Sequence, residues 1–199
     1  MQYYMKKGLI FELKRKSIHL LSLIFVAIYI FFLKYYGEQS GLIVLTLMLV
    51  LFLLLEFFRV QLKKKIPIIH GLWRSKEKNR MGGQVYLIAG MIIAFAVFDF
   101  RIALAVFLMV IFGDMAAAII GIRFGKHPMF GMKNRDWEGF AAEFIVDFAI
   151  GLFLLNNFYI ILAMALTATF VERMFTFADD NLLVPVIAGF VGQVLYFIL

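Results

Sequence analysis

The stretch "IFGDMAAAIIGIRFGKH", residues 111–127, places a carboxylate inside a long apolar segment. Small residues recur at every fourth position through it: Gly113, Ala117, Gly121 and Gly125. This spacing lets helix backbones approach each other closely in a membrane. At about 100° per residue, Asp114 shares the sector of these small residues, so we expect it to face packed protein and not lipid. A carboxylate within a membrane helix is costly and is a functional candidate by default.

The composition of the whole chain predicts an all-α polytopic membrane protein. Of its 199 residues, 64% are hydrophobic, whereas soluble domains are about half apolar. A bilayer core about 30 Å thick needs roughly 20 residues of helix, and seven apolar stretches are that long or nearly so. We place them at residues 17–36, 41–58, 82–99, 101–122, 140–156, 158–177 and 182–199. No separate soluble domain is indicated, so residues 1–199 are predicted to form a single membrane domain.

The basic residues predict the orientation of this domain. The formal net charge is +7, and most Lys and Arg fall before the first span or near the ends of spans two, four and six. Only Lys34 and Arg101 fall on the other side of a seven-span chain. Because basic segments stay cytoplasmic, the N-terminus is predicted inside and the C-terminus outside. Topology and contact with anionic lipid explain the remaining charge, and we expect no nucleic-acid partner.

Four polar clusters lie at the predicted cytoplasmic ends of the spans, and the stretch that contains Asp114 is one of them. In another, Glu12, Arg15, Lys16 and His19 are spaced i, i+3, i+4 and i+7, which places them on one helical stripe. A basic anchoring helix with a Glu12–Arg15 pair is the simpler alternative. We favour a functional role, because an anchor needs neither the glutamate nor the histidine.

The third cluster is "KNRDWEGFAAEFIVD", residues 133–147, in which Lys133 and Arg135 precede several carboxylates. Glu143 and Asp147 are i,i+4 neighbours on the predicted span. Two carboxylates on one helix face suit either a divalent cation or an internal basic partner. For Asp147 we favour the second alternative, a structural pair with an arginine on a neighbouring helix.

The fourth cluster is "VERMFTFADDNLLVP", residues 171–185. Its polar members are Glu172, Arg173, Asp179, Asp180 and Asn181. Capping of the last helix explains one of the acids but not the whole group. Two further polar groups can be purely structural: Glu56 with Arg59 in span two, and Arg80 with Gly82 and Gly83 at the start of span three.

The chemistry available to these clusters is narrow. Carboxylates suit Mg²⁺, which proteins bind through one or two carboxylates plus substrate phosphates, and Lys and Arg suit the phosphates. The chain has no cysteine and three histidines, so thiolate metal sites are excluded. This combination of carboxylates with Lys and Arg favours phosphoryl or nucleotidyl transfer. We expect a lipid as one substrate, because the predicted site lies at the membrane edge. A cation or phosphate transporter ranks second, since broken helices in two matched halves are not found.

These motifs resemble the CTP-dependent lipid kinases, the family of dolichol kinase, phytol kinase and yeast-type diacylglycerol kinase, which is related to the phosphatidate cytidylyltransferases. The resemblance covers nearly the whole chain through four motifs in order. The family's "E..RK..H" is matched by Glu12, Arg15, Lys16 and His19; "GD..A...G...GK" by Gly113, Asp114, Ala117, Gly121, Gly125 and Lys126; "K-[ST]-x-E-G" by Glu138 and Gly139 of "RDWEG"; and "E…DN…P" by Glu172, Asp180, Asn181 and Pro185.

One departure from the family pattern concerns the third motif. The family lysine falls on Arg135 and the hydroxyl position falls on Asp136, while Lys133 comes two residues early. Which cation contacts phosphate, Lys133 or Arg135, is therefore open. Arg135 can bind phosphate through two nitrogens where a lysine acts as a point charge.

The resemblance implies Mg²⁺-assisted transfer of the CTP γ-phosphate to the hydroxyl of a membrane lipid alcohol, such as a polyprenol, dolichol, phytol or a geranylgeraniol-like alcohol. It implies catalytic roles for Asp114, Asp180 and Glu138, with Asp114 and Asp180 as metal ligands. The residues expected to bind nucleotide or phosphate are Arg15, Lys16, His19, Arg80, Gly121, Gly125, Lys126, Lys133, Arg135, Gly139, Glu172 and Asn181.

The related cytidylyltransferases are the alternative within this resemblance, because they make a CDP-lipid and pyrophosphate. They are usually longer and have a fuller "SPKKT.EG" motif, so the short chain and "RDWEG" favour the kinase. The expected location is an integral membrane protein with its active site facing the cytoplasm, in the plasma membrane if the source is prokaryotic. A homodimer is possible, since the small-residue face could also pack against a second subunit.

Overall fold

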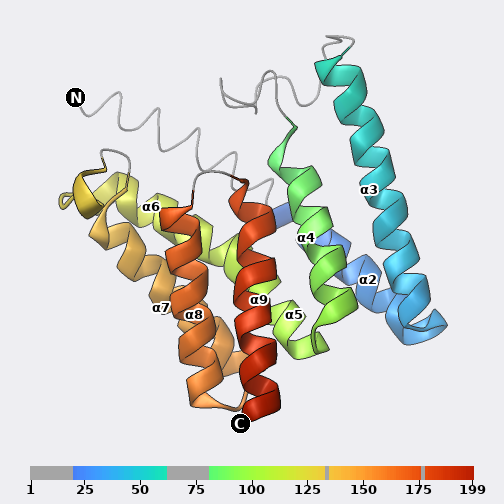
Figure 1. Ribbon diagram of the computed structural model, residues 1–199. Coiled ribbons are helices and arrows are strands. Elements are labelled where there is room, and N and C mark those ends of the chain that lie inside the picture. The colour runs from blue at the N-terminus through green and yellow to red at the C-terminus, as the bar shows by residue number, and fades with distance from the viewer. Residues whose placement is uncertain (1–19, 62–80, 133–134, 176–177) are drawn as a thin grey trace.

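The computed structural model describes residues 20–61, 81–132, 135–175 and 178–199. These residues form α-helices, and within them the only extended pairing is an isolated bridge between Pro128 and Asp136. The helices, shown in Figure 1, are α2 (Leu23–Tyr36), α3 (Glu38–Val60), α4 (Gly83–Val97), α5 (Phe100–Leu108), α6 (Asp114–Phe124), α7 (Trp137–Leu154), α8 (Phe158–Met174) and α9 (Asp180–Ile198). A π-helical turn, η2 (Met109–Gly113), joins α5 to α6, and a 3₁₀ turn, η3 (Met129–Gly131), precedes α7.

The all-α prediction is confirmed for the described residues, and each predicted apolar stretch overlaps a helix. The segment α5–η2–α6 is continuous over 25 residues, Phe100–Phe124. Three helical segments are long and apolar enough to cross a membrane: Glu38–Val60, Phe100–Phe124 and Asp180–Ile198. The helices Leu23–Tyr36 and Gly83–Val97 are apolar but shorter. Seven crossings and a cytoplasmic N-terminus therefore stay predictions.

Local sequence explains where the helices begin. A side-chain oxygen accepts a hydrogen bond from a backbone N–H in the first turn of four of them, which satisfies a group that has no partner inside the helix. The caps are Asp99 for α5, Asp136 for α7, Asn157 for α8 and Asp179 for α9. Between α2 and α3 the chain reverses at Gly37, whose φ of +88° is strained for any residue with a Cβ.

The helices pack in a chain of neighbours that brings distant segments together. Helix α4 packs between α3 and α9, α9 packs on α8, α8 on α7, and α7 on α6. The contact between α4 and α9 is close, because a Cβ at Gly90 would lie 2.8 Å from the backbone oxygen of Asn181. The starts of α4, α7 and α9 and the end of α8 therefore lie at one end of the bundle, as Figure 1 shows.

The small-residue face of the opening stretch is used inside the chain. A Cβ at Gly113 would overlap the Asp147 side chain of α7, and Cβ atoms at Gly121 and Gly125 would meet Asp136 just before α7. Packing of this face is thus confirmed, with α7 as its partner.

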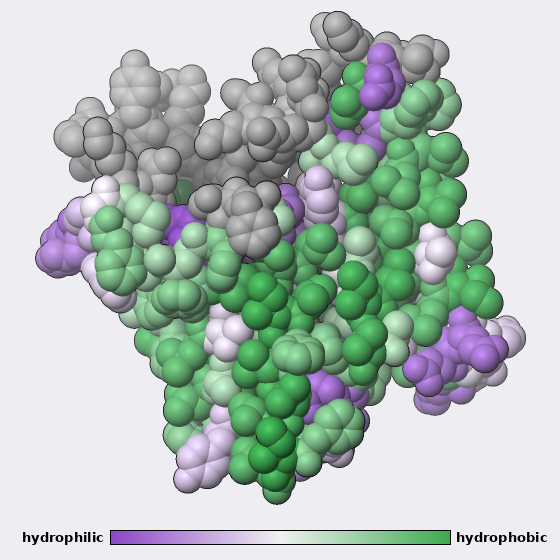
Figure 2. Space-filling model, viewed as in Figure 1, coloured by the Kyte–Doolittle hydropathy of each residue, from purple (hydrophilic) through white to green (hydrophobic). Residues whose placement is uncertain are grey.

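Apolar side chains cover most of the outer surface. Figure 2 shows hydrophobic residues over the sides of the helices, with hydrophilic residues near both ends of the bundle. Helix α3 is the extreme case: 17% of its most apolar window is buried, against 56% for the segment Phe100–Phe124. A helix that is apolar on nearly every side and yet exposed suits a lipid environment.

Candidate functional site

Asp114 is the first residue of α6, directly after the π-helical turn η2. It is half-buried, and the preceding Gly113 is buried against α7. Single π-turns within α-helices occur frequently at functional sites. The position is compatible with the predicted role of Asp114 as a magnesium ligand, which stays a prediction.

Asp147 lies beneath this turn and is 1% exposed. Its Oδ2 accepts a hydrogen bond from the Thr169 hydroxyl at 3.3 Å, and its Oδ1 has no partner. The predicted pairing of Asp147 with an arginine is therefore wrong. Thr169 of α8 faces Asp147, and the arginine on α8 lies one helical turn further along, next to a different carboxylate.

That arginine is Arg173, which pairs with Glu143. Its Nε donates to Oε2 of Glu143 at 2.8 Å, and the two residues are 8% and 1% exposed. The pair joins α7 to α8 in the interior. Of the two alternatives for Glu143, the structure shows the internal basic partner.

The segment between α6 and α7 folds back on itself. The N–H of Met129 donates to the oxygen of Arg135 at 2.8 Å, and the N–H of Trp137 donates to the oxygen of His127 at 3.0 Å. These bonds flank the bridge between Pro128 and Asp136. They fix Arg135 and the cap of α7 relative to the end of α6.

Glu138, a predicted catalytic residue, contacts His127. Its Oε1 lies 2.6 Å from His127 Nδ1, and its Oε2 accepts from the His127 N–H at 3.3 Å. The hydrogen bond from His127 lowers the pKa of Glu138 to about 2, so the carboxyl is ionised at neutral pH. His127 was not among the predicted site residues, because its partner lies across the folded segment and not at a helical spacing.

Asp136 fills the space above three glycines that were predicted to bind phosphate. A Cβ at Gly121 would lie 2.7 Å from Oδ2 of Asp136, and a Cβ at Gly139 would lie 3.0 Å from Oδ1. A Cβ at Gly125 would lie 2.8 Å from Cγ of the same carboxylate. The N–H of Gly139 donates to Oδ1 at 2.6 Å. In this conformation the glycines make room for an acidic side chain of the chain itself.

Arg135, the second cation of the third cluster, is partly buried. Its Nη1 is buried and has no hydrogen-bond partner. Burial lowers the pKa of Arg135, and the neighbouring charge of Arg173 lowers it further. Three carboxylates oppose this shift: those of Glu172, Asp180 and Glu143. Arg135 therefore lies among charges of both signs from α7, α8 and α9.

The start of α9 adds a compact acidic turn. Oδ1 of Asp179 accepts from the backbone N–H and the side-chain Nδ2 of Asn181, at 3.1 and 2.7 Å. Asp180 also accepts from the Asn181 N–H, at 3.0 Å. Burial raises the pKa of Asp179 to about 6, with the charge of Asp180 as the second cause. A Cβ at Gly83 would lie 2.8 Å from Asn181 Nδ2, which places the start of α4 against this turn.

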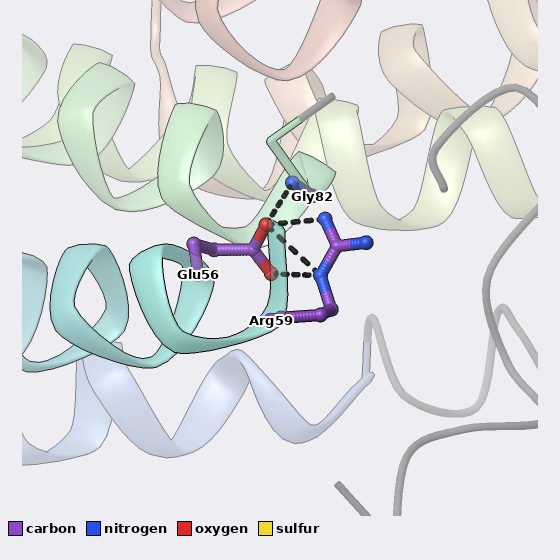
Figure 3. Close-up of polar contacts among 3 residues, drawn as sticks. All are labelled: Glu56, Arg59 and Gly82. Carbon is purple, nitrogen blue, oxygen red and sulfur yellow. Dashed lines mark hydrogen bonds and ion pairs between the residues drawn. The ribbon is translucent and has the colours of Figure 1, made fainter. Parts of the chain in front are cut away.

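Glu56 and Arg59 form a second buried pair, in α3 (Figure 3). Nε of Arg59 donates to both carboxylate oxygens of Glu56, at 3.1 and 3.2 Å, and the N–H of Gly82 donates to Oε2 at 3.0 Å. The structural alternative fits this pair, because it fastens the start of α4 to α3.

The described residues thus bring together part of the predicted site. Arg135, Glu172, Asp180 and Asn181 converge at the ends of α7, α8 and α9, whereas Lys126 is exposed on the segment after α6. Within the described ranges, no group of three or more His, Asp or Glu side chains is arranged to hold a metal ion. The predicted residues Arg15, Lys16, His19, Arg80 and Lys133 lie outside the described residues.

The fold and these residues define an all-helical protein with membrane-length helices and a site of mixed charge at one end of the bundle. A curated protein described as "Probable phytol kinase, chloroplastic", from Triticum aestivum, is 30% identical over 140 residues. The match covers 61% of this chain and 47% of the relative, so the chain spans about half the length of the curated relative it matches. No protein-family model and no solved structure match the chain.

Proposed function

We propose that the protein is a lipid kinase that transfers the γ-phosphate of CTP to the hydroxyl of a membrane lipid alcohol, with Mg²⁺ as cofactor. The observation that supports this most is the position of Arg135, whose buried Nη1 has no partner and which lies among carboxylates of α7, α8 and α9. Similarity to a protein described as a probable phytol kinase supports the reaction class. Phytol, geranylgeraniol-like alcohols and polyprenols including dolichol are the candidate acceptors.

The mixed charge of the site matches the needs of this reaction. An arginine binds phosphate oxygens through charge-assisted hydrogen bonds, so we assign phosphate binding to Arg135 in preference to Lys133. Asp180 and Asp114 would supply oxygen ligands to Mg²⁺, an ion that proteins bind through one or two carboxylates plus substrate phosphates. When bound, Mg²⁺ neutralises charge that develops on the phosphates.

The other residues of α8 and α9 support these groups. Asn181 donates from its side chain to Asp179, and its N–H is shared between Asp179 and Asp180, so it holds the acidic turn in shape. Glu172 is 9% exposed and lies close enough to Arg135 to raise the pKa of that arginine. We propose that Glu172 keeps Arg135 charged and oriented towards the nucleotide.

Transfer to an alcohol requires a carboxylate that accepts the hydroxyl proton. Glu138 is engaged with His127, so in this proposal Asp114 or Asp180 takes that role. The alcohol oxygen attacks the γ-phosphorus, the bond to the β-phosphate oxygen breaks, and CDP leaves. The site faces the cytoplasm, where CTP is available.

The proposal is tested with purified protein in lipid nanodiscs, CTP labelled at the γ-phosphate, Mg²⁺ and a panel of alcohols. We expect label in the lipid fraction with at least one alcohol, and its loss in Asp114→Asn with the fold retained. CTP labelled at the α-phosphate separates the alternatives, because only a cytidylyltransferase would move that label into lipid. Absence of lipid label from either nucleotide would refute both enzymes and leave the transporter.

A further inference from the structure

We propose that Arg173 is a second phosphate-binding residue of this site, and that Glu143 is a positioning residue that holds Arg173 in place. The identity of the phosphate, the triphosphate of a nucleotide, rests on the proposed function. Arg173 is in the fourth polar cluster but matches no position of the family motifs, and its proposed role follows from its contacts on α7.

The contact with Glu143 uses one edge of the arginine. Nε of Arg173 donates to Oε2 of Glu143 at 2.8 Å, deep between α7 and α8. A guanidinium has five N–H donors, and this hydrogen bond is the one that the structure gives Arg173 within the described part of the chain. The four N–H groups on the Nη nitrogens are therefore not committed to the carboxylate.

The Nη edge of Arg173 reaches the start of α7. Nη2 lies 3.1 Å from the position that a Cβ would take at Gly139, so the absence of that Cβ is what admits the arginine. Gly139 is in the first turn of α7, and its N–H donates to Oδ1 of Asp136. The buried guanidinium of Arg173 therefore adjoins a capped helix start, a place where anions are stabilised.

Arg135 approaches the same place from the preceding segment. Asp136, the residue after Arg135, places its Oδ1 3.0 Å from the Cβ position at Gly139, beside Nη2 of Arg173 at 3.1 Å from the same point. Nη1 of Arg135 is buried without a partner, and the charge of Arg173 lowers the pKa of Arg135. A buried guanidinium nitrogen without an acceptor is unfavourable, and a phosphate oxygen would supply the missing acceptor. A phosphate group is tetrahedral and offers several acceptor oxygens, so it can accept from the planar donor forks of two arginines at once.

The carboxylates nearby limit which phosphate can bind. Glu143, Glu172 and Asp180 act on Arg135 together with Arg173, so carboxylates as well as a second guanidinium lie near this arginine. These carboxylates would disfavour a bare anion, whereas a complex of triphosphate with Mg²⁺ brings its own cation. We therefore expect Arg173 to contribute to binding of the magnesium complex.

A purely structural role for Arg173 is the competing explanation, and the pair itself offers a way to separate the two. Replacement of both members of a buried ion pair by apolar residues of similar size is often neutral for stability. The double variant Glu143→Met/Arg173→Met therefore preserves the fold if the pair is structural, and it removes the proposed phosphate ligand. Arg173→Lys is the milder variant, because lysine can pair with Glu143 but lacks the second edge.

The experiment measures binding of inorganic triphosphate and of CTP, each with Mg²⁺, to wild type and variants in nanodiscs, together with KM for CTP and kcat. We expect the double variant and Arg173→Lys to weaken binding of both ligands roughly tenfold or more. We expect KM to rise more than kcat falls, while thermal stability of the double variant stays near that of wild type. The matched control is Arg101→Met, with unchanged affinity. Arg101 lies two residues after Asp99, whose N–H donates to Gln193. Gln193 lies 13 residues from Asp180 along α9, about 20 Å by helix rise, so Arg101 is remote from the proposed site.

The outcomes separate this inference from the proposed function. Unchanged binding in a folded double variant would overturn the role of Arg173 while the lipid kinase assignment stood. Weaker triphosphate binding in the variants, with no lipid phosphate formed by wild type, would support Arg173 and overturn the proposed reaction. Failure of wild type to bind either triphosphate would overturn the inference.

Discussion

Two largely buried ion pairs in the described part of the chain differ in which arginine nitrogens they leave available for other contacts. Glu56 and Arg59 lie one turn apart on α3, and two nitrogens of Arg59 and the N–H of Gly82 all donate to the one carboxylate. Glu143 and Arg173 are 30 residues apart on α7 and α8, and a single nitrogen joins them. The first pair fastens a helix start, whereas the second holds an arginine whose outer edge faces the start of α7. Similar chemistry thus serves packing at one place and, in our proposal, ligand binding at the other.

The largest effect on stability is expected from breaking the inter-helix pair on one side. Arg173→Met leaves Glu143 in the interior without its cation, and removal of one member of a buried pair costs about 3–5 kcal/mol. Chemical denaturation in detergent micelles measures the free energy of unfolding. If Arg173→Met and Glu143→Met/Arg173→Met have the same free energy of unfolding, Arg173 does not stabilise the buried carboxylate of Glu143.

A smaller loss of stability is expected at the other pair. Arg59→Met leaves Glu56 with the N–H of Gly82 as a donor, so we expect a cost of about 1–3 kcal/mol, as for one unsatisfied group. We expect the affinity for CTP, measured by equilibrium dialysis, to stay within about twofold of that of wild type, because this pair serves packing. A large drop in affinity would contradict the contrast between a packing pair and a binding pair.

The glycines around Asp136 test how tightly α6 and α7 are packed. Gly121→Ala forces a Cβ against the Asp136 carboxylate, and overpacking of this kind costs about 1–3 kcal/mol. Asp136→Ser keeps a capping oxygen for α7 while shortening the side chain, so it should recover part of that loss in the double variant. Strict additivity of the two free-energy changes would show that the residues do not share this space.

The smallest expected effect is a pH dependence at the start of α9. The pKa of Asp179 is raised to about 6 in the folded protein from an ordinary value near 3.8, so the folded state takes up the proton more readily than the unfolded state. This residue's contribution to stability is therefore greatest at low pH and falls as pH rises from about 4 through 6. Asp179→Asn keeps the cap and should remove this slope in thermal scans between pH 4 and 8. A slope that is identical in the variant would contradict the assignment.

Sequence patterns predicted the elements whose signals are local. The apolar stretches located the helices to within a few residues, and the small residues at Gly113, Gly121 and Gly125 identified a close packing face, which α7 occupies. The i,i+3 spacing also revealed the pair in α3. These predictions succeeded because composition and periodicity act within one helix.

Contacts between helices were beyond such patterns. An arginine on a neighbouring helix was expected beside Asp147, but Thr169 contacts Asp147 and the arginine of α8 pairs with Glu143. Likewise, no spacing rule links His127 to Glu138, or brings Asp136 over glycines of both α6 and α7, because the folded segment between these helices sets both contacts. The register between helices depends on side-chain packing that one sequence does not display.

The central claim, that the mixed-charge site phosphorylates a lipid alcohol from CTP, is tested most directly by a product balance. Phosphorus NMR of the protein in nanodiscs with Mg²⁺, CTP and phytol or another alcohol of the panel reports every phosphorus species at once. The account predicts that CDP and lipid monophosphate rise in equal amounts as CTP falls, and that Arg135→Gln suppresses both. Formation of pyrophosphate with a CDP-lipid, or no consumption of CTP with any alcohol, would contradict it.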